Sequence, residues 1–213
     1  ITAEGLNALK TAKTQELTDY AAANGLDVPA NGILAATTEQ AVLSAFNTAK
    51  QSMENIVSAR IAATQTLAAY ALSKGVEVPA NGIAQAKTVE AIDEALNIAK
   101  AAVDQLAASK TKVEAAKAAI AALDGKKGEA LFNQLKAAET ALNALSAEEK
   151  AQVDLTAYNT AKSALEAFVN GAAADLETAH SVGATLAAAE IGAVVAAVAT
   201  LAALAFVLKR GIR

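Results

Sequence analysis

Apolar residues recur at three- and four-residue intervals along most of the chain, which is the spacing of one face of an α-helix. Val42, Phe46, Met53 and Ile56 illustrate the pattern. No glycine or proline interrupts residues 38–74 or residues 88–123. Each of these stretches predicts a single helix of roughly 55 Å, and a shorter helix is expected over residues 2–24. The pattern therefore predicts an all-α protein built from long helices.

An internal repeat organises the first half of the chain. Residues 17–50 and 67–100 align without gaps at a shift of 50, and 17 of the 34 aligned positions are identical. The string VPANGI occurs whole in both copies. The two segments are therefore a duplication.

Each copy carries the signals that end one helix and begin the next. A glycine follows the helical stretch, where a left-handed capping residue is expected. A proline then prevents the helix from continuing, a second glycine supplies another turn, and a threonine caps the following helix. We expect rigid corners of the same shape in both copies, and their key residues are Gly25, Pro29, Gly32, Gly75, Pro79 and Gly82. Long helices joined by such corners predict an elongated antiparallel bundle with an up-down-up course.

The pattern changes after residue 124. A helix is expected over residues 129–145, and Ser146 with Glu149 matches a capping box that opens another turn. A further helix is expected through Tyr158 and Leu165, ending at Gly171. We therefore predict three domains: a duplicated long-helix bundle over residues 1–124, a smaller helical hairpin over residues 125–171, and a C-terminal helix over residues 172–213.

The C-terminal segment is the most distinctive part of the sequence. Residues 191–208 are 18 uncharged residues, followed by a basic terminus. This length reaches the lower range for crossing a hydrocarbon core, and the positive-inside rule would leave the N-terminal part outside. A buried helix of a soluble bundle is the alternative. The residues expected in an assembly or membrane core are Ile191, Gly192, Ala193, Val194, Val195, Ala197, Val198, Leu201, Ala203, Leu204, Phe206 and Val207, and the basic terminus consists of Lys209, Arg210 and Arg213.

The small side chains of this segment bear on what it packs against. Small residues let helix backbones approach closely, so the segment suits packing against copies of itself. An alanine-rich lipid anchor would have the same composition. The chain begins at Ile1 without an initiator methionine, which leads us to expect either a removed signal peptide or a trimmed chain.

Composition and charge narrow the chemistry. Hydrophobic residues make up 54% of the chain but aromatic residues only 3%, and the net charge of −4 is spread over mixed charges. No basic stripe precedes the C-terminal segment, which argues against nucleic-acid binding by that part. Cysteine is absent and His180 is the only histidine, so neither a thiolate nor a histidine cluster can hold a metal. We expect no catalytic site, no cofactor and no small-molecule substrate.

Two resemblances follow from particular strings. KTVEAIDEALNIAKAAVDQL and LKAAETALNALSAEEKAQVDLTAYNTAKSALEAF resemble the helical repeats of Gram-positive surface proteins, which implies an extracellular stalk or adhesive module. The C-terminal segment with its basic end resembles the mature major coat proteins of filamentous phages and, less closely, conjugative pilins. That resemblance implies a helical sheath in which Lys209, Arg210 and Arg213 line the DNA. The long N-terminal part departs from those single-helix subunits.

These observations favour two functional hypotheses. The first is a non-enzymatic structural subunit of an extracellular filament, in which the C-terminal helices form the core and the repeats project outward. The second is a membrane-anchored cell-surface spacer or adhesin that does not polymerise. Both imply export, with copies of the chain and membrane lipid, at least transiently, as partners, and nucleic acid as a partner only if the basic terminus acts as in a coat protein. A wall-sorting motif of the Leu-Pro-x-Thr-Gly type is absent, which argues against covalent attachment to a cell wall.

Overall fold

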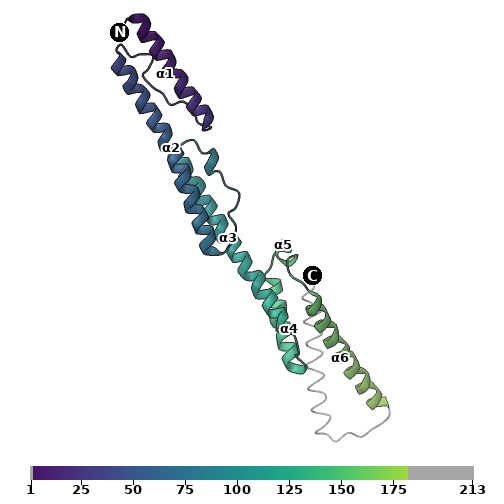
Figure 1. The fold of residues 1–213 in the computed structure, drawn as a ribbon. Helices are drawn as coiled ribbons and strands as arrows, with labels where there is room; N and C mark the ends of the chain where they lie inside the picture. Colours follow the sequence, from purple (N-terminus) through teal and green to yellow (C-terminus); the bar gives the residue numbers. More distant parts are fainter. Residues whose placement is uncertain (1, 182–213) are drawn as a thin grey trace. The chain divides into compact units, whose positions relative to one another are not determined.

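The computed structural model describes residues 2–181, and these residues form an all-helical structure (Figure 1). The elements are α1 (Ala3–Ala23), α2 (Glu39–Lys74), the short 3-10 helix η1 (Ile83–Gln85), α3 (Val89–Ala121), α4 (Gly128–Asn143), α5 (Ala147–Lys150) and α6 (Thr156–Ser181). The predicted all-α class is confirmed. None of the helices in the described residues is long and apolar enough to cross a membrane. The C-terminal segment, residues 191–208, lies outside the described residues.

Helix ends follow local capping signals in the sequence. Thr2 and Thr38 accept hydrogen bonds from the backbone N–H groups of Gly5 and Ala41, and so they cap α1 and α2. Gly75 ends α2 with a left-handed φ of 66°, a conformation that glycine adopts without steric cost. The expected helices over residues 2–24, 38–74 and 88–123 agree with the observed bounds to within two residues.

The chain divides into two compact units between Ala108 and Ser109, a point that lies within α3. The domain prediction placed this division after residue 124 instead, at the loop that follows α3. A long helix can contribute side chains to two cores in succession, so the units need not divide at a loop. Each unit is described in turn.

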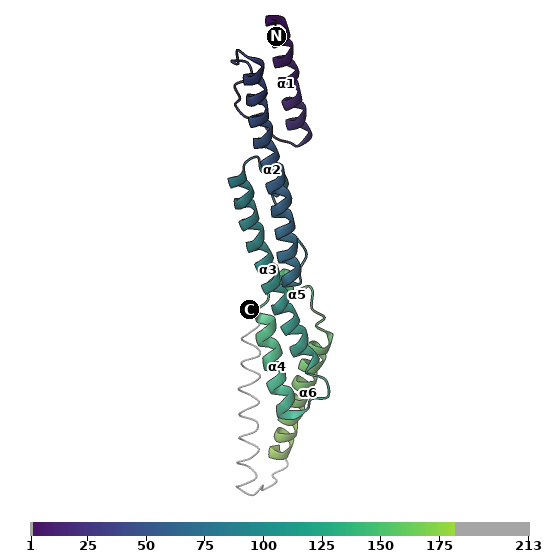
Figure 2. The same cartoon turned by 60° about the vertical axis from the view of Figure 1, so that its left-hand side comes forward.

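In the first unit, neighbouring long helices run parallel rather than antiparallel. Lys13 of α1 lies 4.4 Å from the ring centroid of Phe46 in α2, and Glu16 lies 3.7 Å from Lys50. Residues later in α1 therefore contact residues later in α2, which means that the two helices point in the same direction. The predicted antiparallel arrangement is wrong for this unit, and Figures 1 and 2 both show the chain returning beside α1 before α2 begins.

The second helix pair repeats this parallel geometry further along α2. Arg60 bonds to the carbonyl of Ala86, just before α3, and Lys74 forms an ion pair of 3.1 Å with Asp104 inside α3. The connection of residues 75–88 must therefore run back along α2. Fully extended, the 14 residues of this connection reach about 46 Å. That exceeds the roughly 21 Å by which α2 rises between Arg60 and Lys74.

The parallel pairs create two cores that lie in succession along α2. The first contains α1, its corner and the first half of α2, and the second contains the remaining half of α2, the second corner and α3. Ile56 packs against both cores. The buried residues of the first core are Leu17, Ala21, Leu26, Ile33, Ala36, Val42, Phe46, Ala49 and Met53, and those of the second are Ala63, Leu67, Ala71, Ile83, Ile92, Ala99 and Val103.

In the second unit, α3 and α4 run antiparallel. The link between α3 and α4 is short, with left-handed glycines at Gly125 and Gly128, and the Gln134 side chain of α4 bonds to the carbonyl of Ala119 at 3.1 Å. Its core gathers the end of α3 with α4 and α6. The buried residues are Val113, Ala116, Ile120, Leu123, Leu135, Ala138, Leu142, Leu145, Val153 and Leu165.

Two predictions about this unit have different outcomes. The capping box is confirmed, because Ser146 Oγ accepts from the Glu149 N–H and the Glu149 carboxylate accepts from the Ser146 N–H at 2.7 Å. The predicted break at Gly171 is wrong, since α6 continues through it to Ser181. A single glycine in a helix interior costs only about 1 kcal/mol, which the rest of the helix tolerates.

Candidate functional site at the repeat corners

The two corners are built by the same hydrogen bonds. Gly25 has a φ of 60°, and the N–H of Leu26 reaches back to the carbonyl of Ala21 at 2.9 Å. In the second copy the Val76 N–H reaches Ala71 at 3.1 Å. This six-to-one bond around a left-handed glycine is a Schellman motif, and it satisfies carbonyls that a helix end would otherwise leave unpaired.

An asparagine then fixes the extended part of each corner. The Asn31 amide donates to the carbonyl of Pro29 at 3.1 Å, and its oxygen accepts from the Ile33 N–H at 3.2 Å. Asn81 makes the same two bonds at the same distances. The isoleucine that follows is fully buried in both copies, which is worth roughly 1.5–3 kcal/mol each. The expectation that both corners share one shape is confirmed.

The second glycine of each corner serves a different purpose from the first. The Gly32 carbonyl accepts from the Ala36 N–H at 3.0 Å, and Gly82 accepts from Ala86 at 3.1 Å. These bonds close the second turn that the sequence predicted. A Cβ atom at Gly32 would lie 3.9 Å from the Cβ of Ala45, an ordinary contact. This turn therefore does not depend on glycine as strictly as the turns at Gly25 and Gly75 do.

One arginine joins the first corner to the second. Arg60 Nη1 donates to the carbonyl of Asn24 at 2.7 Å, and Nε donates to the carbonyl of Ala86 at 2.7 Å. A third, longer contact of 3.5 Å reaches Gly25. Beside it, Lys87 forms a bidentate ion pair with Asp27 at 2.8 and 2.9 Å. We call this set of contacts the junction.

The junction is well matched to a helix end. The carbonyls of Asn24 and Gly25 directly follow the last residue of α1 and lie at the negative end of its dipole. The Arg60 guanidinium supplies positive charge and several N–H donors to them. The junction was not predicted, although the sequence carries one signal for it: Lys10, 50 residues before Arg60, is also basic.

A lysine also lies beside the corner tyrosine in both copies. Lys50 Nζ is 5.9 Å from the Tyr20 ring centroid, and Lys100 Nζ is 5.7 Å from that of Tyr70. Both distances lie within the range of cation–π attraction. Each contact joins the end of one helix to the next long helix.

Acidic groups complete these lateral contacts. The Tyr70 hydroxyl donates to Asp104 at 2.8 Å, and this bond, followed by the Lys74 contact, holds the pKa of the Asp104 carboxyl below its usual value. The same carboxylate raises the pKa of Lys74. Within α1, the hydrogen bond from Lys13 lowers the pKa of Glu16. The Asp104, Lys74 and Glu16 side chains are exposed, so the contacts orient the helices more than they stabilise them.

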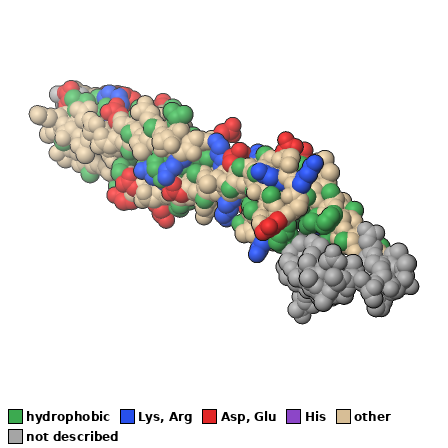
Figure 3. All heavy atoms as spheres, turned by 90° about the horizontal axis from the view of Figure 1, so that it is seen from below, with side chains coloured by type: hydrophobic (Ala, Val, Ile, Leu, Met, Phe, Trp, Pro, Cys, Tyr) green, Lys and Arg blue, Asp and Glu red, His purple; other side chains and the backbone are tan. Residues whose placement is uncertain are grey.

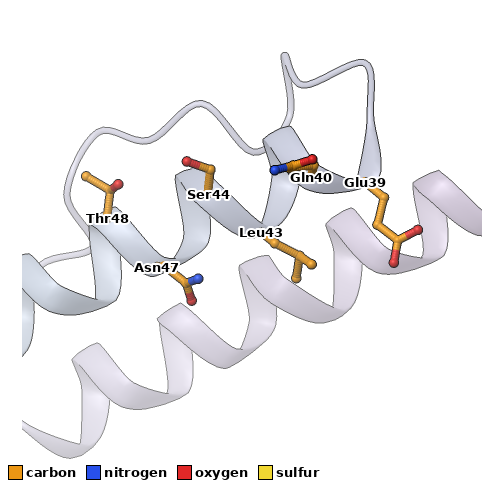
Figure 4. Close-up of a pocket in the computed structure, with 6 residues that line it drawn as sticks. All are labelled: Glu39, Gln40, Leu43, Ser44, Asn47 and Thr48. Carbon is orange, nitrogen blue, oxygen red and sulfur yellow. The ribbon is translucent and has the colours of Figure 1, made fainter.

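The remaining surface offers little concentrated chemistry. A shallow open hollow runs along one side of α2 (Figure 4), lined by Glu39, Gln40, Leu43, Ser44, Asn47 and Thr48. On the face seen in Figure 3, acidic and basic side chains are interspersed. Within residues 2–181, no group of three or more histidine, cysteine, aspartate or glutamate side chains is arranged to hold a metal ion.

The structure places the six predicted corner residues in two equivalent turns. The predicted assembly or membrane core and the basic terminus, residues 191–213, lie outside the described residues. Comparisons with protein-family models, curated proteins and solved structures find no match to this chain. The features of the chain that bear on function are therefore the repeats, the junction and the sequence of the C-terminal segment.

Proposed function

We propose that this chain is a non-enzymatic structural subunit of an extracellular filament. In this proposal the C-terminal apolar helices, residues 191–208, pack together as the filament core, and the repeats of the first unit project outward. The basic terminus of Lys209, Arg210 and Arg213 would face the lumen and would contact nucleic acid if the filament encloses it. Export and transient insertion in a lipid membrane precede assembly.

The observation that supports a structural role is the sharing of α2 by two successive cores. Because Ile56 packs on both cores and Arg60 bonds to both corners, neither repeat can rotate freely about the other. A helix that is continuous through both repeats keeps them in a fixed register. Such a shared helix is suited to hold the two corners of the first unit at a set distance from one another.

The C-terminal sequence favours assembly over simple anchoring. It holds many alanines with Gly192 and Thr200 and few bulky residues. Close approach between helix backbones requires small side chains, whereas contact with lipid does not. Packing against other copies is therefore the interaction that makes the most use of this composition.

A membrane-anchored spacer that does not polymerise is the second candidate, and the shared helix favours it equally. The two functions differ in what surrounds residues 191–208. In a filament the segment is buried among copies of the chain, and in a spacer it lies in lipid.

Negative-stain electron microscopy of material released from cells that produce the chain tests the proposal. Uniform filaments containing this chain are expected, and Ala197→Leu or Ala203→Leu should abolish them while leaving the protein membrane-associated. Ala68→Leu is the matched control, because it makes the same change at an exposed position of α2. Recovery of the chain only as a detergent-solubilised monomer would refute the filament and support the spacer.

A further inference from the structure

The surface that receives the end of α1 has an equivalent at the start of the first unit. A shift of 50 residues relates Arg60 to Lys10 and Lys87 to Thr37, and it relates η1 to the turn at residues 33–35. The chain therefore carries the receiving side of the junction twice. We call the first copy, formed by Lys10, Leu34 and Thr37, the N-terminal surface.

The two surfaces differ in what covers them. Two of the Arg60 hydrogen bonds are partly buried, because the end of α1 lies over them. Lys10 instead bonds to the carbonyl of Leu34 at 2.9 Å, and this bond is exposed. None of the described helices of the first unit ends against Lys10. The Leu34 side chain beside it is 75% exposed.

We propose that the N-terminal surface is a docking surface for the end of another helix of this repeat type, joined in tandem. The occupant would end in a left-handed glycine and carry an acidic residue two positions later, as Gly25 and Asp27 do. The occupant follows from continuity with the junction, where this kind of helix end already lies on the equivalent residues.

The chemistry of the N-terminal surface fits such an occupant. The Lys10 ammonium group has three donors and uses one of them on Leu34. The other donors can reach the terminal carbonyls of an incoming helix, whose dipole places negative charge there. Leu34 supplies apolar area that docking would cover. Thr37 cannot reproduce the ion pair of Lys87 with Asp27, so docking is expected to be weaker than at the junction.

A tandem fusion tests this proposal directly. A duplicate of residues 1–50 is placed immediately before Ile1 of the full chain, which preserves the 50-residue period. The chain has no cysteine, so two introduced cysteines carry spin labels without further changes. Dipolar electron paramagnetic resonance then measures the distance from Ala23→Cys in the added copy to Ala35→Cys in the original chain. The reference is the pair Ala23→Cys and Gln85→Cys in the unfused protein, which spans the existing junction.

The docked fusion should give a distance distribution with the same centre and similar width as the reference pair. Lys10→Glu should broaden it, because a carboxylate repels the terminal carbonyls. The double substitution Lys10→Arg and Thr37→Lys, which installs the residues of the junction, should narrow it. The same double substitution should slow amide exchange at the end of the added helix by about tenfold, as expected for a charged hydrogen bond.

Three outcomes would overturn the proposal. One is a broad distance distribution in the fusion that changes neither with Lys10→Glu nor with the double substitution of Lys10 and Thr37. Another is circular dichroism that shows no added helix. A third is a dipolar contact that arises only between separate chains. None of these readouts involves residues 191–213, so their failure is distinguishable from the failure of the filament proposal.

Discussion

Replacing Arg60 by methionine should uncouple the two repeats of the first unit. Methionine keeps most of the aliphatic stem but removes the guanidinium donors. The substitution loses the two bonds of 2.7 Å to Asn24 and Ala86, while the contact of 3.5 Å to Gly25 contributes little. Hydrogen bonds from a charged donor are worth about 1.5–3 kcal/mol each, but both are only partly buried and both carbonyls can be rehydrated. We therefore expect a loss of about 2–3 kcal/mol in the stability of the corners.

Amide hydrogen exchange across the first corner is the appropriate assay, because it reports local opening as well as global unfolding. A loss of about 2 kcal/mol corresponds to a roughly thirtyfold increase in the opening equilibrium. Exchange of the Leu26 amide, which is bonded to Ala21, should accelerate by this factor. Exchange in α4 should not change.

Lys10→Met provides the matched control. It removes the basic side chain that lies 50 residues before Arg60, but the bond it removes is exposed. Its effect on exchange should therefore be small, about threefold or less. If Arg60→Met and Lys10→Met change exchange at the first corner equally, the junction does not couple the repeats and the reasoning fails.

Three other predictions concern single positions. Gly75→Ala forces a side chain into a left-handed backbone, so it should lower the free energy of unfolding in urea by about 1–2 kcal/mol. Gly82 does not have a positive φ, so Gly82→Ala should change that free energy by less than about half as much. Asp104→Asn should lower the stability of the protein only at pH values above the depressed pKa of the Asp104 carboxyl. The stabilisation that the ionised group provides is present above pH 4 or so and is lost as the pH falls through the folded pKa. The melting temperatures of Asp104→Asn and the parent should therefore differ at pH 6 and converge near pH 2, and a constant difference would contradict this. Ser146→Ala should cost about 1 kcal/mol by removing the capping box, and an unchanged urea midpoint would show that α5 does not depend on this cap.

The helix bounds could be read from the sequence because their signals are local. Thr38 caps α2 through its own side chain, and Gly75 ends α2 through its own backbone conformation. Both effects act within a few residues of the position that causes them. The equal shape of the two corners was likewise predictable, because identical residues make identical local bonds.

The direction of the helices could not be read in the same way. A proline and two glycines indicate that the chain turns, but they do not say how far it then travels. The buried Ile33 and Ile83 hold the connection against the helices, so it returns along α1 or α2 before the next helix begins. Connections between antiparallel helices usually have two to eight residues, and the greater length of these connections was the available clue. The junction was missed for a related reason, since Arg60 meets Asn24 only after this return.

The parallel packing of α1 on α2 is the claim on which the shared cores and the junction both depend. Spin labels at Asn7→Cys, Ala22→Cys and Gln40→Cys, introduced in pairs at exposed positions, test it most directly. Parallel packing places residue 7 beside residue 40 and places residue 22 farther from residue 40, by roughly 20 Å along the helix axis. We therefore expect the pair at residues 7 and 40 to give the shorter distance. A shorter distance for the pair at residues 22 and 40 would mean that the helices are antiparallel, and it would contradict the account.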